Sequence, residues 1–223
     1  MRLDILTLFP DMFAPLKESI IGRATKNNDV EINIIQIRDF SQDPHKKTDD
    51  VPYGGGAGMV MTPQPLYDAI MSIKTDKSRV VYLSPRGRVF NQGIAKEYAK
   101  GEHIILVCGH YEGIDQRIID MCVDEELSIG DYVLTGGELP AMVVADCVIR
   151  LLDGVITKGS LEEESFSSGL LEYPQYTRPQ NFMGKEVPEV LISGHHANIA
   201  KWRKEKSLEI TKKNRPDLLK NKD

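Results

Sequence analysis

The sequence predicts an α/β fold built on a parallel sheet, and three observations support this prediction. Residues 104–107 form an unbroken aliphatic run, which is typical of a parallel strand covered on both faces. Residues 80–83 form a second run of this kind, and residues 30–34 alternate between polar and apolar as a strand does. Stretches with apolar residues at helical spacing separate these runs, and such alternation is the pattern of an α/β sheet.

The elements follow in a regular order along the first 150 residues. A first strand ends at Pro10, and Met12, Phe13 and Leu16 then have the spacing of one face of a helix over residues 11–19. The segment 39–62 interrupts this order with prolines and glycines, and so long a loop in a compact domain is usually functional or disordered. Further helices are expected at 63–73, 91–100, 114–121 and, with Pro140 in its first turn, 138–152.

Composition limits the class of protein. At 223 residues the chain is long enough for one sizeable core and a smaller additional unit. Asp4 and Pro10 interrupt the amino-terminal segment, so we expect neither a signal peptide nor a membrane span. The three cysteines lack C-x-x-C spacing and no histidine pair has metal-ligand spacing, which favours reduced thiols in a cytoplasm and predicts no metal site.

Charge is distributed unevenly along the chain. The net charge is −5, yet residues 195–223 carry nine Lys or Arg against four Asp or Glu. This segment is therefore +5 and the remainder is −10, so the carboxyl-terminal end is the candidate for contact with a polyanion. A solvated helix face is the alternative that charge alone does not exclude.

Three loops are expected at one edge of the sheet, at residues 84–88, 108–113 and 129–137. The carboxyl ends of parallel strands share an edge, and ligands of α/β proteins bind outside it. Glycines in the last two loops let backbone N–H and C=O groups approach a ligand closely. Neither loop fits the G-x-G-x-x-G dinucleotide fingerprint, and ordinary tight turns remain the alternative.

Five motifs occur in an order that points to one family. They are PYGGGAGM at 52–59, SPRGR at 84–88, LVCGHYEGID at 106–115, IGDYVLTGGE at 129–138 and YTRP at 176–179. Together they resemble the bacterial tRNA (guanine-N1)-methyltransferases over essentially the whole chain. The resemblance implies a SPOUT-type parallel sheet with helices on both faces, a deep trefoil knot and a small, mainly helical carboxyl-terminal domain. General topology rules do not predict a knot, because true knots are rare.

The resemblance also implies a domain organisation. Residues 1–153 would form the knotted methyltransferase domain, 154–172 a flexible linker and 173–223 a small tRNA-binding domain. The implied reaction moves the methyl group of S-adenosylmethionine to N1 of guanosine 37 in tRNA. The implied cofactor-binding residues are Leu83, Ser84, Pro85, Gly109, Tyr111, Glu112, Gly113, Ile129, Gly130, Asp131, Tyr132, Val133, Leu134, Gly136, Gly137 and Pro140.

The reaction requires two catalytic groups. Guanine N1 is a poor nucleophile until its proton leaves, so a carboxylate base is needed, and a guanidinium can stabilise the charge that develops on O6. The resemblance implies Arg150 for the second role; a cation that balances the dipole at the helix end is the alternative. Glu164 stands where the family usually has an aspartate base, with Glu162 and Glu163 as neighbouring carboxylates.

Contacts with partners are also implied by the resemblance. Ser165, Lys201, Arg203 and Lys204 are expected to contact tRNA, and the protein is expected to be a cytoplasmic homodimer with shared active sites. Whether magnesium is needed stays open. His110 departs from the family pattern, where an arginine is common.

The same residues bear on three other functions. A nucleotide-dependent oxidoreductase is disfavoured by the missing G-x-G-x-x-G after the first strand. The altered base position keeps a catalytically weak or silent RNA-binding SPOUT protein open, and a SPOUT methyltransferase for another RNA nucleotide is a further alternative.

Overall fold

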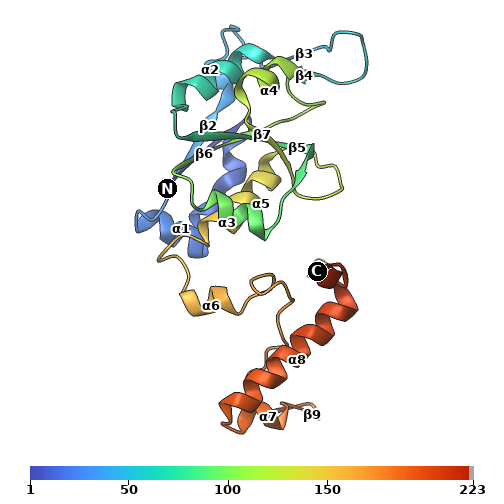
Figure 1. The fold of residues 1–223 in the computed structure, drawn as a ribbon. Helices are drawn as coiled ribbons and strands as arrows, with labels where there is room; N and C mark the ends of the chain where they lie inside the picture. The colour runs from blue at the N-terminus through green and yellow to red at the C-terminus, as the bar shows by residue number, and fades with distance from the viewer. Residues whose placement is uncertain (221–223) are drawn as a thin grey trace. The chain divides into compact units, whose positions relative to one another are not determined.

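The core of the computed structural model is a five-stranded parallel sheet with the strand order β2-β1-β6-β5-β7 (Figure 1). Residues 1–220 are described, apart from the side chains of Lys158, Glu162 and Lys220, and residues 221–223 of the expected carboxyl-terminal domain lie outside the described residues. The strands are β1 (Arg2–Thr7), β2 (Glu31–Gln36), β5 (Ser78–Val89), β6 (His103–Cys108) and β7 (Glu125–Ser128). Each neighbouring pair of strands is parallel, as predicted.

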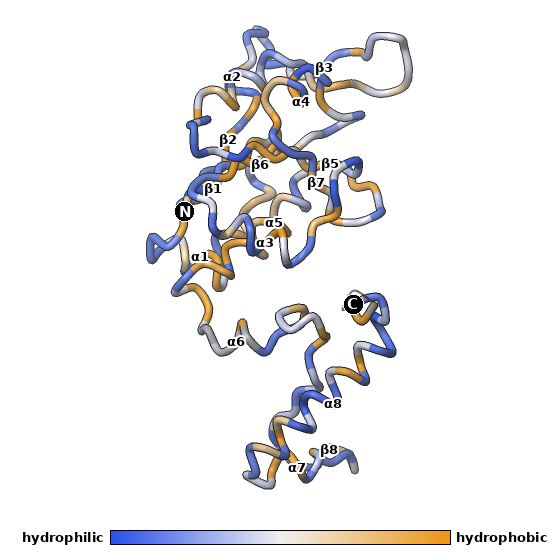
Figure 2. Tube along the Cα trace, viewed as in Figure 1, coloured by the Kyte–Doolittle hydropathy of each residue, from blue (hydrophilic) through white to orange (hydrophobic). Residues whose placement is uncertain are grey.

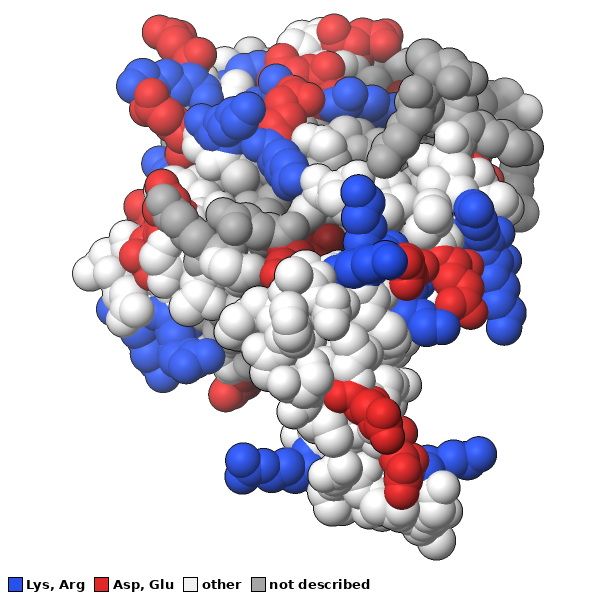
Figure 3. All heavy atoms as spheres, turned by 60° about the horizontal axis from the view of Figure 1, so that its bottom comes forward, with Lys and Arg blue, Asp and Glu red and all other residues white. Residues whose placement is uncertain are grey.

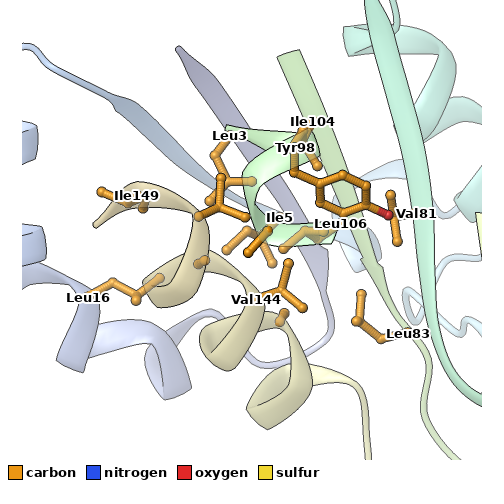
Figure 4. Packing of buried hydrophobic residues seen from close by; sticks show 14 of the residues in the cluster. Leu3, Ile5, Leu16, Val81, Leu83, Tyr98, Ile104, Leu106, Val144 and Ile149 are labelled. Atoms are coloured by element: carbon orange, nitrogen blue, oxygen red, sulfur yellow. The ribbon is translucent and has the colours of Figure 1, made fainter. Parts of the chain in front are cut away.

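Alternate residues of the strands pack against helices on opposite faces of the sheet. Leu3, Ile5 and Leu106 belong to a cluster with α1 (Ser19–Lys26), α3 (Gln92–Tyr98) and α5 (Glu138–Ile149). Leu6 and Val107 belong to a second cluster with α2 (Pro63–Ile73) and α4 (Gln116–Cys122). Apolar residues accordingly follow the strands in Figure 2, and Figure 4 shows side chains of β1, β5, β6, α3 and α5 meeting in one layer. The predicted α/β architecture is thus confirmed.

Strand β5 is longer than the sequence predicts. Its pairing with β7 shifts in register between Leu83 and Arg88, so the expected loop at 84–88 is a bulge within a strand. Arg86 and Arg88 form ion pairs with Glu126 and Glu125 of β7. These pairs keep a charged segment extended, which hydrophobic patterning alone does not indicate.

The first predicted helix is wrong in type and extent. Residues Pro10–Lys17 form a 3-10 helix, η1, and Glu18 is extended before α1 begins at Ser19. Pro15 lies inside the segment and has no N–H to continue an α-helical hydrogen-bond ladder. The long segment after β2 holds a second 3-10 helix, η2 (Ile37–Phe40), and a short antiparallel pair, β3 (Asp49–Asp50) with β4 (Val60–Met61).

The chain divides into two compact units, Met1–Ile156 and Thr157–Asp223. The second unit contains a hairpin and four helices in its described part: α6 (Lys158–Glu162), β8 (Asn181–Phe182), β9 (Lys185–Glu186), α7 (Glu189–Ile192), α8 (His196–Asn214) and α9 (Asp217–Lys220). The segment before the hairpin is tied to α8, because Leu171 N donates to Thr211 Oγ1 at 2.9 Å. None of the described helices is long and apolar enough to cross a membrane.

Candidate functional site

A cavity of about 330 Å³ lies in the first unit, where β6 and β7 end and β5 bulges. Its walls come from residues 82–86, 109–116 and 127–140. Strands β5, β6 and β7 run parallel, so their following segments emerge at one edge of the sheet. The convergence expected from the sequence is therefore present.

Backbone hydrogen bonds hold these segments together. Gly137 N donates to Gly109 O at 2.9 Å, and His110 and Gly136 form an isolated antiparallel bridge. Met61 N donates to Gly113 O at 2.9 Å, which ties the end of the long 39–62 segment to the same wall. The cavity thus has a backbone framework that is fixed by the fold.

Two glycines make this close packing feasible. A Cβ on Gly137 would lie 2.7 Å from Cys108 Cα and 3.0 Å from Gly109 N, which are backbone atoms that cannot move aside cheaply. A Cβ on Gly109 would lie 2.8 Å from the ring of Tyr82. Glycine is therefore needed at these positions because neighbouring segments pack too closely for a side chain, and not because of an ordinary turn.

The expected cofactor residues lie in the cavity wall, with one exception. Asp131 is exposed and is not part of the lining. The others line the cavity: Leu83, Ser84, Pro85, Gly109, Tyr111, Glu112, Gly113, Ile129, Gly130, Tyr132, Val133, Leu134, Gly136, Gly137 and Pro140.

Further lining residues were not predicted. His110 and Thr135 lie inside the predicted loops and were available to sequence reasoning, whereas Gln116 reaches the cavity from α4 without any sequence signal. Tyr82 lines it from the buried part of β5, and burial raises the pKa of its phenol, so the hydroxyl stays protonated near neutral pH. The wall therefore combines apolar surface with neutral polar groups and two charged side chains, those of Arg86 and Glu112.

His110 and Glu138 lie beside Gly136. The Nδ1 atom of His110 is buried and has no hydrogen-bond partner among the described residues, and the ring contacts Phe9 and Tyr111. Glu138 is buried at the start of α5, where its Oε1 accepts a hydrogen bond from Thr7 Oγ1 at 2.8 Å. This bond fixes the start of α5 against β1. The carboxylate of Glu138 is also favourable there because it lies in the first turn of α5, at the positive end of the helix dipole.

The two candidate catalytic residues lie in different units. Arg150 is half-buried at the carboxyl end of α5 and is not part of the cavity lining. Glu164 belongs to a turn in the second unit, where its carbonyl accepts from Ser167 N at 3.2 Å. Ser165 Oγ accepts from Glu172 N at 3.0 Å, so this hydroxyl already has a structural role.

The expected tRNA-binding cations differ in their surroundings. Lys201 is exposed on α8, and its Nζ lies 3.9 Å from Oε1 of Glu205. Lys204 is also exposed. Arg203 is paired with Glu163 at 3.2 Å and stacks over Tyr173, with its guanidinium carbon 4.6 Å from the ring centre. Basic side chains also lie beside acidic ones on the face in Figure 3. Lys201 and Lys204 are thus the more accessible of these cations.

Metal ligands do not cluster in the described part of the chain. No group of three or more His, Cys, Asp or Glu side chains there is placed to hold a metal ion. The three thiols are free, and burial raises the pKa of Cys108 well above its ordinary value, which makes it unreactive.

Comparison with known proteins places the chain in a family. The family profile described as "tRNA (Guanine-1)-methyltransferase TrmD" matches residues 1–221. The chain belongs to this family. A tRNA (guanine-N(1)-)-methyltransferase of Ruminiclostridium cellulolyticum is 60% identical over 223 residues, covering 98% of this chain and 96% of the relative. Proteins of the same name from Clostridium beijerinckii and Clostridium tetani are 59% and 57% identical, each covering 92% of the relative.

Membership confirms the resemblance inferred from the five motifs. It makes the chain an enzyme of the tRNA (guanine-1)-methyltransferase type, and it leaves no support for an oxidoreductase. The match extends across both units, so the second unit is part of the family pattern rather than an unrelated appendage.

Proposed function

We propose that the protein transfers the methyl group of S-adenosylmethionine to N1 of guanosine 37 in tRNA. The observation that carries this proposal is the glycine-lined cavity at the sheet edge in a chain that belongs to the tRNA (guanine-1)-methyltransferase family. The relatives that share about three-fifths of its residues are named for methylation of guanine N1 in tRNA.

The cavity suits S-adenosylmethionine in size and chemistry. Its volume of about 330 Å³ lies in the range of small-ligand sites. Backbone groups beside Gly109 and Gly137 can bond the polar edges of a purine, while Leu83, Ile129 and Leu134 offer apolar surface to its faces. S-adenosylmethionine supplies the electrophilic methyl group, and the walls hold it in a defined orientation.

The catalytic roles belong to side chains outside this cavity. Glu164 takes the proton from guanine N1, and the longer side chain of glutamate reaches N1 from a turn where aspartate is usual. The Arg150 guanidinium stabilises the negative charge that develops on O6. N1 then attacks the methyl carbon, the S–CH3 bond breaks and its electron pair stays on sulfur, so S-adenosylhomocysteine is the leaving group. The proton remains on Glu164 until it is lost to solvent.

The assembly that we propose is a homodimer with shared active sites in a knotted, cytoplasmic SPOUT protein. Exposed apolar side chains near the cavity support an interface there. Tyr132 and Val133 are 55% and 83% exposed, and Leu139 and Val143 of α5 are 48% and 43% exposed. Exposed apolar residues gathered in one region are typical of protein–protein contacts.

Transfer of labelled methyl from S-adenosylmethionine to a tRNA transcript with guanosine at positions 36 and 37 tests the proposal. We expect labelled 1-methylguanosine at position 37 and no label when guanosine 37 is replaced by adenosine. Binding of tRNA without methyl transfer would instead identify a silent RNA-binding protein. Label at another nucleotide would identify a different SPOUT activity, and EDTA in the same assay tests for a magnesium requirement.

A further inference from the structure

A second cavity, of about 490 Å³, lies wholly within the second unit, and it differs in character from the first. Its apolar part is formed by side chains of α7 and α8, including Leu191 and Ile199. Tyr173, Tyr176, Arg178 and Gln180 surround this part with rings, an amide and a guanidinium. The described residues that line it include no carboxylate. A site of this composition favours a planar, polar-edged ligand that is not cationic.

Arg203 gives the cavity wall a guanidinium that is already engaged by its neighbours. Its Nη1 is paired with Glu163 and its guanidinium stacks over Tyr173, but its Nε is buried and has no hydrogen-bond partner among the described residues. Because Nε has almost no accessible surface, a ligand in the cavity would reach this atom only after the side chain shifted. Arg203 therefore adds positive charge to the cavity wall without offering this atom to a ligand.

Tyr176 offers the cavity an aromatic surface. Its side chain is 48% exposed, and its ring centre lies 6.3 Å from that of Trp202 with the two planes tilted by 56°. Tyr173 is less available, because Arg203 already covers its ring. An unstacked nucleobase pairs an aromatic face with a polar edge, and proteins bind such bases by stacking and by hydrogen bonds to that edge.

We propose that this cavity binds one unstacked nucleobase of the tRNA, with Tyr176 against its face and Gln180 and Arg178 at its polar edges. The inference rests on the proposed tRNA substrate and adds a second contact point, separate from the residues that hold the methyl donor or perform the transfer. This role would also explain why the second cavity, next to the basic helix α8, has a wall of aromatic and amide side chains.

The full-length protein contains its own reporter for this test. Trp202 is the only tryptophan in the chain and contacts Tyr176. An anticodon stem-loop RNA with guanosine 36 and 37 should quench its fluorescence as it binds. Guanosine monophosphate should not do so in the same concentration range. Equal quenching by the mononucleotide would reassign the cavity to a free nucleotide and overturn the RNA assignment.

Variants of the cavity wall provide the binding test. Tyr176→Ala should raise the Kd for tRNA at least about fivefold, the lower end expected for loss of one base–aromatic stack. Tyr176→Phe keeps the ring and should retain the parent Kd. Gln180→Ala, on an exposed side chain that leaves the fold intact, should raise the Kd about two- to tenfold. Phe182→Ala is the matched control, since Phe182 is a 64% exposed aromatic of the same unit outside the lining.

The outcomes separate this inference from the proposed function. Affinity for S-adenosylmethionine should be the same in all variants, because its cavity lies in the other unit. A parent protein that methylates tRNA, with Tyr176→Ala and Gln180→Ala both within twofold of the parent Kd, would overturn the inference alone. A parent that binds no tRNA would overturn both.

Discussion

The carboxylate of Glu163 accepts a hydrogen bond from Arg203 Nη1 at 3.2 Å and another from the hydroxyl of Tyr173. Glu163, which precedes the proposed base Glu164, therefore connects its own turn to α8 through Arg203. Changing Glu163 to Gln should lower the free energy of unfolding of the second unit by less than about 1 kcal/mol, because the pair is solvent-exposed. A double-mutant cycle with Arg203→Gln, followed by thermal unfolding, measures the coupling, and additive effects would show that the pair contributes nothing.

Replacement of Glu164 tests the assigned base. Glu164→Gln keeps the size of the side chain but removes its basicity, so single-turnover methyl transfer should slow by about 10²- to 10⁴-fold. Affinity for S-adenosylmethionine and tRNA should change little, and Glu164→Asp should retain activity. Glu189→Gln, at an exposed carboxylate in the same unit, is the control. A Glu164→Gln enzyme as fast as its parent would mean that another group takes the proton.

Gly137→Ala tests the backbone framework of the cofactor cavity. The added methyl group would lie 2.7 Å from Cys108 Cα, so the loop must shift, at a cost of about 1–3 kcal/mol in stability. Calorimetry should show that binding of S-adenosylmethionine is lost or greatly weakened. Gly159→Ala provides the control, because nothing lies within 4 Å of a Cβ at that position. Parent-like binding by Gly137→Ala would show that the loop contact is not needed.

The first unit alone should bind the methyl donor. A fragment of residues 1–156 keeps the entire cavity lining and both hydrophobic clusters of the sheet. We expect it to bind S-adenosylmethionine with the affinity of the full chain, provided that it dimerises, and to have lost tRNA binding. Size-exclusion chromatography and calorimetry check this expectation. A folded dimeric fragment without affinity for the donor would disprove it.

Salt should weaken the binding of tRNA. Exposed cations of α8 that contact phosphates release counterions, so log K should fall linearly with log salt concentration. Lys201→Gln or Lys204→Gln should lower that slope by about one unit without changing affinity for S-adenosylmethionine. Lys96→Gln in the first unit, on α3, is the comparison. A tRNA affinity that is independent of salt would argue against phosphate contacts.

The parts of the fold that the sequence predicted are those with strong hydrophobic patterns. The strand at 104–107 is buried on both faces and reads as an apolar run, so β6 was predictable. Strand β7 was not, because Glu125 and Glu126 make it look like a polar turn, and their ion pairs with Arg88 and Arg86 come from tertiary structure. The type of the first helix was also not predictable from hydrophobic periodicity. Pro15 lacks the N–H that an α-helix needs, and periodicity does not register this constraint.

The cofactor cavity was more predictable from the sequence than the roles of the carboxylates around Glu164. The cavity follows from glycine loops after parallel strands, and motif recognition added the individual residues. Gln116 reaches the wall from α4, and Asp131 is exposed and outside the lining although it lies within a motif. The sequence alone does not distinguish Glu163 from its neighbour Glu164, whereas the structure shows Glu163 in contact with Arg203 and Tyr173.

The buried apolar side chains of the described residues all precede residue 150, whereas the buried side chains described in the second unit are those of Ser207 and Thr211. Unfolding of the second unit consequently exposes little hydrocarbon, and nearly all of the heat-capacity increment of denaturation should come from the sheet. Amide hydrogens of α8 should exchange with solvent through local opening, long before those of β6. If the second unit binds tRNA as proposed, it can adjust to the contour of the RNA at a small enthalpic cost, while the sheet keeps its geometry.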